Sequence, residues 1–115
     1  MRTMIMFALA AGTFAAPALA GDRTGYQAIA AGDYTAAEKT LVNERRIFPH
    51  RPELMINLGT VYARTGRVSE AASLYRAALA SEPVEMALPD GGAASSHVVA
   101  QRGLDSLAPV ALAGR

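Results

Sequence analysis

Residues of the same type recur 34 positions apart in the middle of this chain. Shifting the sequence by 34 positions brings together four identical pairs: Gly25 with Gly59, Gly32 with Gly66, Ala37 with Ala71, and Pro49 with Pro83. Glycine and proline mark turns and close approaches of the backbone, so four coincidences in one register indicate one structural unit used twice. A unit of this size cannot bury an apolar face alone, which predicts that the two copies stack.

Each unit is predicted to be a pair of helices joined by a short turn. Apolar residues follow a helical period, as Leu54, Leu58 and Val61 do, and no run within the units alternates like a strand. Glycine and proline supply the stops, and Asp22 and Asp33 supply N-caps. The predicted helices run from the Asp22 cap to Ala31, from Tyr34 to Ile47, from about Glu53 to Thr65, and from about Ser69 to Ser81.

The C-terminal segment does not repeat this unit. Residues 89–92, Pro-Asp-Gly-Gly, form a strong turn signal. Ser95 or Ser96 can then cap a helix from His97 to about Leu107, which Pro109 is predicted to end, and the tail is expected to fray. We expect this helix to cover the open apolar edge of the second helical pair.

The second unit resembles the tetratricopeptide repeat, whose pattern is W-x2-L-G-x2-Y, then A-x3-F, then P. Met55 stands in place of the Trp and Tyr75 in place of the Phe, and both are still bulky. The first unit keeps its glycines and Pro49 but has Thr24 at the Leu position, so it resembles a degenerate N-terminal repeat. The residues predicted to pack the repeat are Met55, Leu58, Gly59, Tyr62, Ala71, Tyr75, Ala78 and Pro83.

The helical periods and the resemblance together predict an all-α fold. Two antiparallel helix-turn-helix hairpins should stack as a short solenoid, closed by a C-terminal capping helix. A close helix crossing needs small residues, so we expect Gly59 and Ala71 to face each other, with Tyr62 and Tyr75 beside them. The predicted segments are a signal peptide at 1–20, a degenerate repeat at 21–51, a repeat at 52–85, and a turn, capping helix and tail at 86–115.

Residues 1–20 have the three parts of a secretory signal. Arg2 gives a positive start, an uncharged apolar run extends from Met4 to Ala16, and Ala18 and Ala20 suit a small-residue cleavage site. The alternative is an uncleaved membrane anchor, but the run is shorter than the about 20 apolar residues that span a bilayer. We predict cleavage after Ala20, no stable membrane anchor afterwards, and a periplasmic or secreted protein.

Composition argues against several kinds of chemistry. The chain has no cysteine and 2 histidines, which lie far apart in the sequence, so disulfides and metal sites are not expected. Loss of Arg2 with the signal leaves 10 basic residues against 10 acidic ones. This neutrality argues against binding to nucleic acid or to a membrane surface. No cofactor is predicted.

Ser96 and His97, with Asp90, Asp105 or Glu85 nearby, provide the residue types of a Ser-His-acid triad. Adjacent side chains that open a helix usually diverge, however, and no G-x-S-x-G motif is present. A serine N-cap beside a partly exposed histidine is the simpler interpretation. We therefore predict that the chain is not an enzyme.

One face of the third predicted helix carries polar residues at steps of four, three and four, apart from its apolar face. In the tetratricopeptide repeat family this face lines a concave groove that often holds an extended peptide or a partner's tail. The resemblance therefore implies a groove here, and an ordinary solvated helix face is the alternative. The predicted groove residues are Arg23, Tyr26, Glu53, Asn57, Thr60 and Arg64.

These features favour a protein–protein interaction module that acts without catalysis. Our leading hypothesis is an exported adaptor or assembly factor that binds a protein or peptide partner on the concave face. The alternative is a structural or self-associating module that forms a homodimer through an exposed edge of the solenoid. The sequence does not identify the partner.

Overall fold

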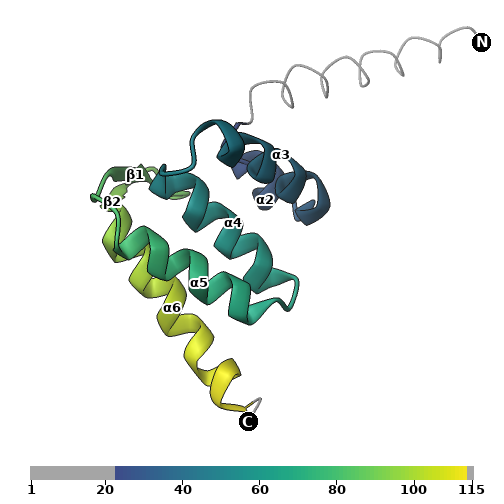
Figure 1. Ribbon diagram of the computed structural model, residues 1–115, viewed down its shortest axis with the longest axis vertical. Coiled ribbons are helices and arrows are strands. Elements are labelled where there is room, and N and C mark those ends of the chain that lie inside the picture. Colours follow the sequence, from purple (N-terminus) through teal and green to yellow (C-terminus); the bar gives the residue numbers. More distant parts are fainter. Residues whose placement is uncertain (1–22, 114–115) are drawn as a thin grey trace, which may run out of the picture.

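The computed structural model describes residues 23–113, with side chains described through Leu107. The predicted signal peptide at 1–20, the Asp22 cap and the last two residues lie outside this range. Within it, the helices are α2 (Tyr26–Ala30), α3 (Tyr34–Ile47), α4 (Pro52–Arg64), α5 (Val68–Leu79) and α6 (Ser96–Ala113), and the strands are β1 (Glu85–Ala87) and β2 (Ala93–Ser95). Successive helices lie side by side as two hairpins followed by α6 (Figure 1). The predicted helical fold is confirmed.

The helix α2 is shorter than the sequence predicted because it begins after a glycine. Gly25 stands at its N-terminus with a φ of 70°, a left-handed conformation that glycine adopts without strain. Gly32, with a φ of 79°, lies in the turn that follows. Asp33 caps α3 as predicted, since its carboxylate accepts a hydrogen bond from the Ala36 amide at 3.2 Å.

The 34-residue interval corresponds to a contact that occurs twice. A Cβ atom on Gly59 would lie 3.0 Å from Cε1 of Tyr75, and one on Gly25 would lie 2.9 Å from Cδ1 of Leu41. Leu41 and Tyr75 are themselves 34 positions apart. In both hairpins, a glycine in or next to the first helix lets a large side chain of the second helix lie against the backbone.

The nearest neighbour of Gly59 is the ring of Tyr75, which was expected to lie beside the crossing of Gly59 with Ala71. The three atoms nearest to a Cβ on Gly59 all belong to the Tyr75 ring, while Ala71 is fully buried in the same core. The space next to Gly59 is thus filled by an aromatic ring. A methyl group on Gly59 would therefore fit only if the ring moved slightly away from the α4 backbone.

The predicted capping helix is present, because α6 packs along α5 and also contacts α4 (Figure 1). Its close approach depends on Gly103, where a Cβ atom would lie 2.5 Å from Cζ of Tyr75. Tyr75 therefore contacts glycines on two other helices. A glycine that lowers the intrinsic helix propensity of α6 permits the contact that holds α6 in place.

The helix α6 continues through Pro109, where the sequence predicted its end, and reaches Ala113. Proline lacks the amide hydrogen that would bond to the carbonyl of Asp105, but its φ is compatible with a helix. More than three turns precede Pro109, so loss of one hydrogen bond does not stop a helix that is already formed. The prediction that the helix ends at about Leu107 is therefore wrong, while the expected fraying of the tail stays a prediction.

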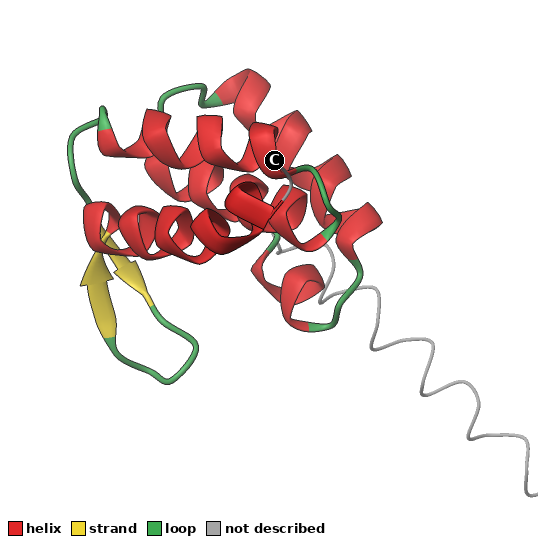
Figure 2. Cartoon of the chain, turned by 90° about the horizontal axis from the view of Figure 1, so that it is seen from below, coloured by secondary structure: helices red, strands yellow, loops and turns green. Residues whose placement is uncertain are grey.

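A small antiparallel hairpin between α5 and α6 was not predicted. Met86 of β1 lies opposite Ala94 of β2, and the expected turn at 89–92 joins the strands. The Leu88 amide donates to the Gly92 carbonyl at 2.8 Å. Figure 2 shows the hairpin projecting from one end of the helical body. Three-residue strands are too short for alternation of polar and apolar residues to reveal them.

One core extends across both hairpins and α6. Leu41, Leu54 and Val61 are among its most deeply buried side chains, and α6 adds Ala100 and Leu107. Burial of apolar surface in a single cluster is the main stabilising contribution in a chain of this size. The helix α6 thus covers apolar surface that two repeats alone would leave exposed.

An ion pair connects α3 with the turn before α5. Arg67 Nη2 donates to Glu38 Oε1 at 2.6 Å, and Arg67 Nη1 donates to Glu38 Oε2 at 3.1 Å. The guanidinium also lies 4.3 Å from the centre of the Tyr62 ring. These hydrogen bonds lower the pKa of the Glu38 carboxyl and raise the pKa of Arg67. The two repeats are therefore joined by a charged contact as well as by the core.

Candidate functional site

A groove lies between α2, α4 and the β hairpin. One hollow in it has a volume of about 330 Å³ and is lined by Glu53 and Asn57 of α4, by Thr24 and Tyr26 at the start of α2, and by residues 85–88. The hairpin therefore forms a wall beside the helix face that the sequence predicted to bind a partner. Two repeats alone would provide only the other two walls.

A second hollow, of about 390 Å³, adjoins the same helix face. It is lined by residues 29–32, at the end of α2 and in the turn that follows, by Tyr34 and Arg64, and by Pro89 of the hairpin turn. Tyr26 lines both hollows and is 46% exposed. Its ring is thus the central accessible surface of the groove.

Four of the six predicted groove residues line these hollows, namely Tyr26, Glu53, Asn57 and Arg64. Arg23 is exposed and lines neither of them. The Thr60 hydroxyl donates to the Ile56 carbonyl at 3.1 Å and lies 3.0 Å from the Tyr75 hydroxyl. Thr60 therefore points toward the interface with α5 and not into the groove.

Asn57 and Arg64 use part of their hydrogen-bonding capacity inside the chain. Asn57 Nδ2 donates to the Thr24 carbonyl at 2.8 Å, and Arg64 Nη1 donates to the Tyr34 hydroxyl at 3.0 Å. Both bonds run from α4 to the first repeat, across the groove floor. Each residue consequently positions the first repeat and also offers its remaining polar atoms to the groove.

The hollow beside β1 is acidic. Glu53 and Glu85 line it, and none of the described residues around it is Lys, Arg or His. Within the described part of the chain, Glu53 Oε1 is buried without a hydrogen-bond partner, a state that costs free energy unless a donor is supplied. Arg64 lies at the second hollow, so the two ends of the groove carry opposite charge.

Comparison with family models gives a match to the family described as Tetratricopeptide repeat over residues 28–88, more than half of the chain. The chain belongs to the tetratricopeptide repeat family. The matched range begins within α2 and ends directly after β1, so it covers both helical hairpins. Comparison with curated proteins and comparison with solved structures each gave no significant match.

Tetratricopeptide repeats are protein–protein interaction modules, and the family is generally a non-catalytic scaffold. The Ser96 hydroxyl here accepts a hydrogen bond from the Val84 amide at 2.9 Å. His97 Nε2 lies 2.7 Å from the Ser81 carbonyl oxygen, while Ser95 accepts from the His97 amide at 3.1 Å and so acts as the N-cap. These serine and histidine side chains connect α6 to the preceding segment.

The hairpin wall of the groove, residues 85–89, was missed by the sequence analysis. The repeat pattern ends at Pro83, so it contains no information about the chain that follows. The Pro-Asp-Gly-Gly turn at 89–92 was the available signal, because such a turn can close a hairpin. It did not indicate where the hairpin would lie on this tetratricopeptide repeat protein.

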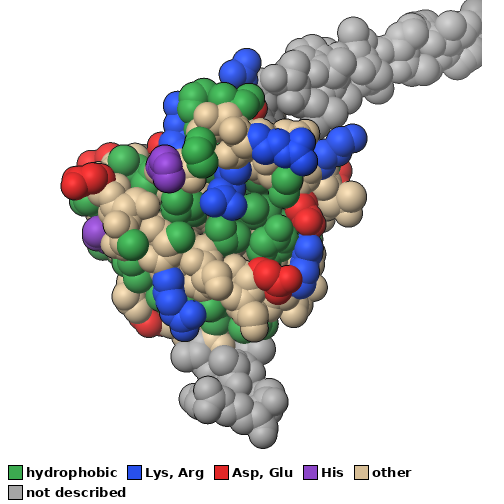
Figure 3. All heavy atoms as spheres, in the orientation of Figure 1, with side chains coloured by type: hydrophobic (Ala, Val, Ile, Leu, Met, Phe, Trp, Pro, Cys, Tyr) green, Lys and Arg blue, Asp and Glu red, His purple; other side chains and the backbone are tan. Residues whose placement is uncertain are grey.

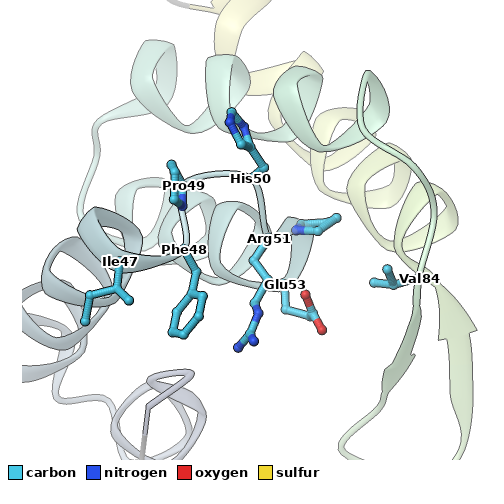
Figure 4. A pocket seen from close by; sticks show the side chains of 8 residues that line it. Ile47, Phe48, Pro49, His50, Arg51, Glu53 and Val84 are labelled. Carbon is cyan, nitrogen blue, oxygen red and sulfur yellow. The ribbon is translucent and has the colours of Figure 1, made fainter.

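A further hollow of about 470 Å³ lies at the turn between the two repeats. Figure 4 shows Ile47, Phe48 and Arg51 on one side of it and Val84 on the other. The Arg51 guanidinium lies 4.1 Å from the centre of the Phe48 ring, and Ile47 is 64% exposed. This surface is mainly apolar and is separate from the groove floor, although Glu53 lines both.

Hydrophobic side chains also gather between basic ones on the face shown in Figure 3. A separate hollow, of about 390 Å³, is lined by Val42 of α3, by Leu58 and Tyr62 of α4, and by Arg45 and Arg46. Residues 23–113 contain no group of three or more His, Cys, Asp or Glu placed to hold a metal ion. None of their helices is long and apolar enough to cross a membrane.

Proposed function

We propose that this tetratricopeptide repeat protein is an exported adaptor or assembly factor that binds an extended segment of a partner protein in the groove. The observation that carries the proposal is the three-walled groove itself, in which the hairpin adds a wall to a face that two repeats leave shallow. The signal-like residues 1–20 support export to the periplasm or secretion.

The groove offers the contacts that an extended peptide needs. The exposed Tyr26 ring supplies apolar surface beside a hydroxyl, and the Asn57 side chain retains an oxygen that can accept a hydrogen bond. Arg64 has further N–H groups besides the one bonded to Tyr34, and arginine suits bidentate contact with a carboxylate. The partner segment is thus expected to be held by polar contacts on either side of one aromatic ring.

Affinity capture from a periplasmic extract tests this function. The tagged mature chain should retain a specific partner, identified by mass spectrometry, and the Asn57→Ala, Arg64→Ala double variant should lose it. Circular dichroism must show that the variant keeps its helical content. Unchanged capture by a folded double variant would contradict binding in the groove.

A matched control separates binding from folding, because Arg64 also holds the first repeat through Tyr34. Tyr34→Phe removes the same hydrogen bond and leaves the arginine in the groove. If Arg64 binds the partner, capture should be lost with Arg64→Ala and kept with Tyr34→Phe. Equal loss with both would show that Arg64 acts only by positioning the first repeat.

Self-association is a second candidate, favoured by the exposed Ile47 and its apolar neighbours Phe48 and Val84. The helix α6 covers α5, so this surface is more accessible than the edge of the second hairpin. Sedimentation at several concentrations should then show a dimer that Ile47→Asp dissociates. A monomer at every concentration would rule the candidate out.

A further inference from the structure

We propose that the partner segment binds as a third strand on the free edge of β1 and places a lysine or arginine side chain against Glu53 and Glu85. This inference rests on the proposed groove function and specifies the chemistry of its ligand. Strand addition to an exposed sheet edge is a general way of holding extended peptides, in which main-chain hydrogen bonds supply affinity and side-chain pockets supply specificity.

The hydrogen-bond register shows which backbone groups of β1 are free. The Ser96 amide donates to the Val84 carbonyl at 2.7 Å, and the Leu88 amide donates to the Gly92 carbonyl at 2.8 Å. Hydrogen-bonded and non-hydrogen-bonded pairs alternate in an antiparallel ladder, so Glu85 and Ala87 form the non-hydrogen-bonded pairs. Their N–H and C=O groups point away from β2, and none has a hydrogen-bond partner among the described residues.

The acidic hollow of the groove runs along this edge of β1. Residues 85–88 all line it, although successive side chains of a strand point to opposite faces. No residue of β2 lines it. A hollow on one face of the strand would be lined by alternate residues. Because consecutive residues line this one, it lies beside the edge of the strand. Tyr26 and Asn57 line the same hollow, whose volume is about 330 Å³.

The charge of the hollow determines the side chain that fits. Glu53 lines the hollow, and its Oε1 is buried without a hydrogen-bond partner among the described residues. Glu85 is exposed at the same hollow, and the described lining contains no basic residue. An ammonium or guanidinium group would supply the missing donor and offset the negative charge. The ligand is therefore an extended segment of another protein with a basic residue at the position that faces Glu53.

The test is selection of random linear peptides, displayed on phage, against the full mature chain. Selected peptides should share one lysine or arginine flanked by residues that favour strands. When a selected peptide is titrated into the ¹⁵N-labelled chain, the amides of Glu85 and Ala87 should shift and exchange more slowly with solvent. Glu53→Gln should weaken binding by about tenfold, whereas Glu82→Gln, the same change outside the hollow, should not.

Two proline substitutions, one on each edge of the hairpin, provide the decisive test of strand addition. Ala87→Pro removes an amide from the free edge of β1, while Ala93→Pro removes the amide opposite it, which points away from β1. Strand addition predicts a loss of about tenfold or more in affinity with Ala87→Pro and little change with Ala93→Pro. Both variants must keep the helical content of the unmodified chain.

The outcomes distinguish the inference from the function on which it rests. Peptides that need Asn57 and Arg64 but tolerate Ala87→Pro, or that lack a basic residue, would overturn strand addition and leave the groove function standing. If no peptide is selected, both fail. A dimer in which the Glu85 and Ala87 amides are protected would overturn the inference in favour of a second copy of this chain as the occupant.

Discussion

Gly103 of α6 lies so close to Tyr75 of α5 that a Cβ atom on it would stand 2.5 Å from Cζ of the ring. Alanine at this position forces α6 or the ring to move, as overpacking of a core does. We expect Gly103→Ala to lower the free energy of unfolding by about 1–3 kcal/mol, even though alanine favours a helix by about 1 kcal/mol. Urea denaturation followed by circular dichroism measures this change.

Arg102→Ala is the control for an alanine substitution away from the contact, because Arg102 is exposed on the same helix. That variant should stay within about 0.5 kcal/mol of the unmodified chain. A Gly103→Ala protein as stable as the unmodified chain would show that α6 does not approach Tyr75 so closely.

Gly59 contacts the same ring less tightly, with a Cβ atom placed 3.0 Å from Cε1 of Tyr75. We expect Gly59→Ala to cost less than Gly103→Ala, since a small shift of the ring relieves it. Gly59→Leu should separate α4 from α5 and destabilise the fold by about 1–3 kcal/mol or more. Chemical denaturation of the three variants side by side gives the order, and a stable Gly59→Leu chain would contradict the repeat register.

Ser96 is fully buried, and its hydroxyl accepts the hydrogen bond of the Val84 amide. Ser96→Ala leaves that amide without its partner, so we expect a loss of about 1–3 kcal/mol in stability. Ser106→Ala, at an exposed position of α6, should change stability by less than about 0.5 kcal/mol. Thermal and urea denaturation test the pair, and equal effects would show that the Val84 contact contributes nothing.

The ion pair between Glu38 and Arg67 predicts a specific pH dependence. The hydrogen bonds from Arg67 lower the pKa of Glu38 in the folded chain, so the pair stabilises the fold above the unfolded carboxyl pKa of about 4.3. This contribution is lost as the pH falls through the lower folded-state pKa. Glu38→Gln should therefore reduce the melting temperature at about pH 7 and leave it nearly unchanged once the pH is below the folded-state pKa of Glu38.

The reduction should be small, because the side chains of Arg67 and Glu38 are 37% and 32% exposed. Melting curves of both proteins at several pH values give the difference directly. A gap between the two proteins that widens in acid would contradict the assigned role of the pair.

The signal-like segment predicts the first residue of the mature protein. When the full chain is expressed in a bacterium with a periplasm, N-terminal sequencing of the exported protein should begin at Gly21. Ala20→Asp places a charge at the cleavage position and should leave the leader attached. Recovery of uncleaved chain from the cytoplasm without that change would contradict export.

Much of the fold could be predicted because its signals are local. Gly66 and Gly32 both adopt left-handed φ values, 85° and 79°, at turns that their spacing had marked. Asp33 caps α3 by accepting a hydrogen bond from an amide only three residues away, which local geometry is enough to predict. The helix α3 has the predicted bounds. The positions of the groove residues on one face of α4 likewise follow from the helical period.

The remaining features depend on contacts between distant residues. Helix propensity alone predicts that Gly103 destabilises α6. The structure shows that Gly103 packs against the Tyr75 ring of α5, a contact that helix propensity does not predict. The spacing of Thr60 placed it with the groove residues, but hydrogen bonds with Ile56 and Tyr75 turn it toward the core. Periodicity assigns a residue to a helix face, and it does not say which neighbour will pack there.

The sequence by itself therefore determined that this is a short tetratricopeptide repeat array, because the repeated glycines, alanines and prolines act through backbone geometry within each hairpin. Only the tertiary structure decided that residues 85–89 form the third wall of the groove and leave an edge of β1 open beside Glu53. The position of that hairpin is set by the packing of α6 on α5 and by the bond between Ser96 and Val84. Such contacts arise from close packing between segments that are distant in the sequence, so they produce no periodic pattern in it.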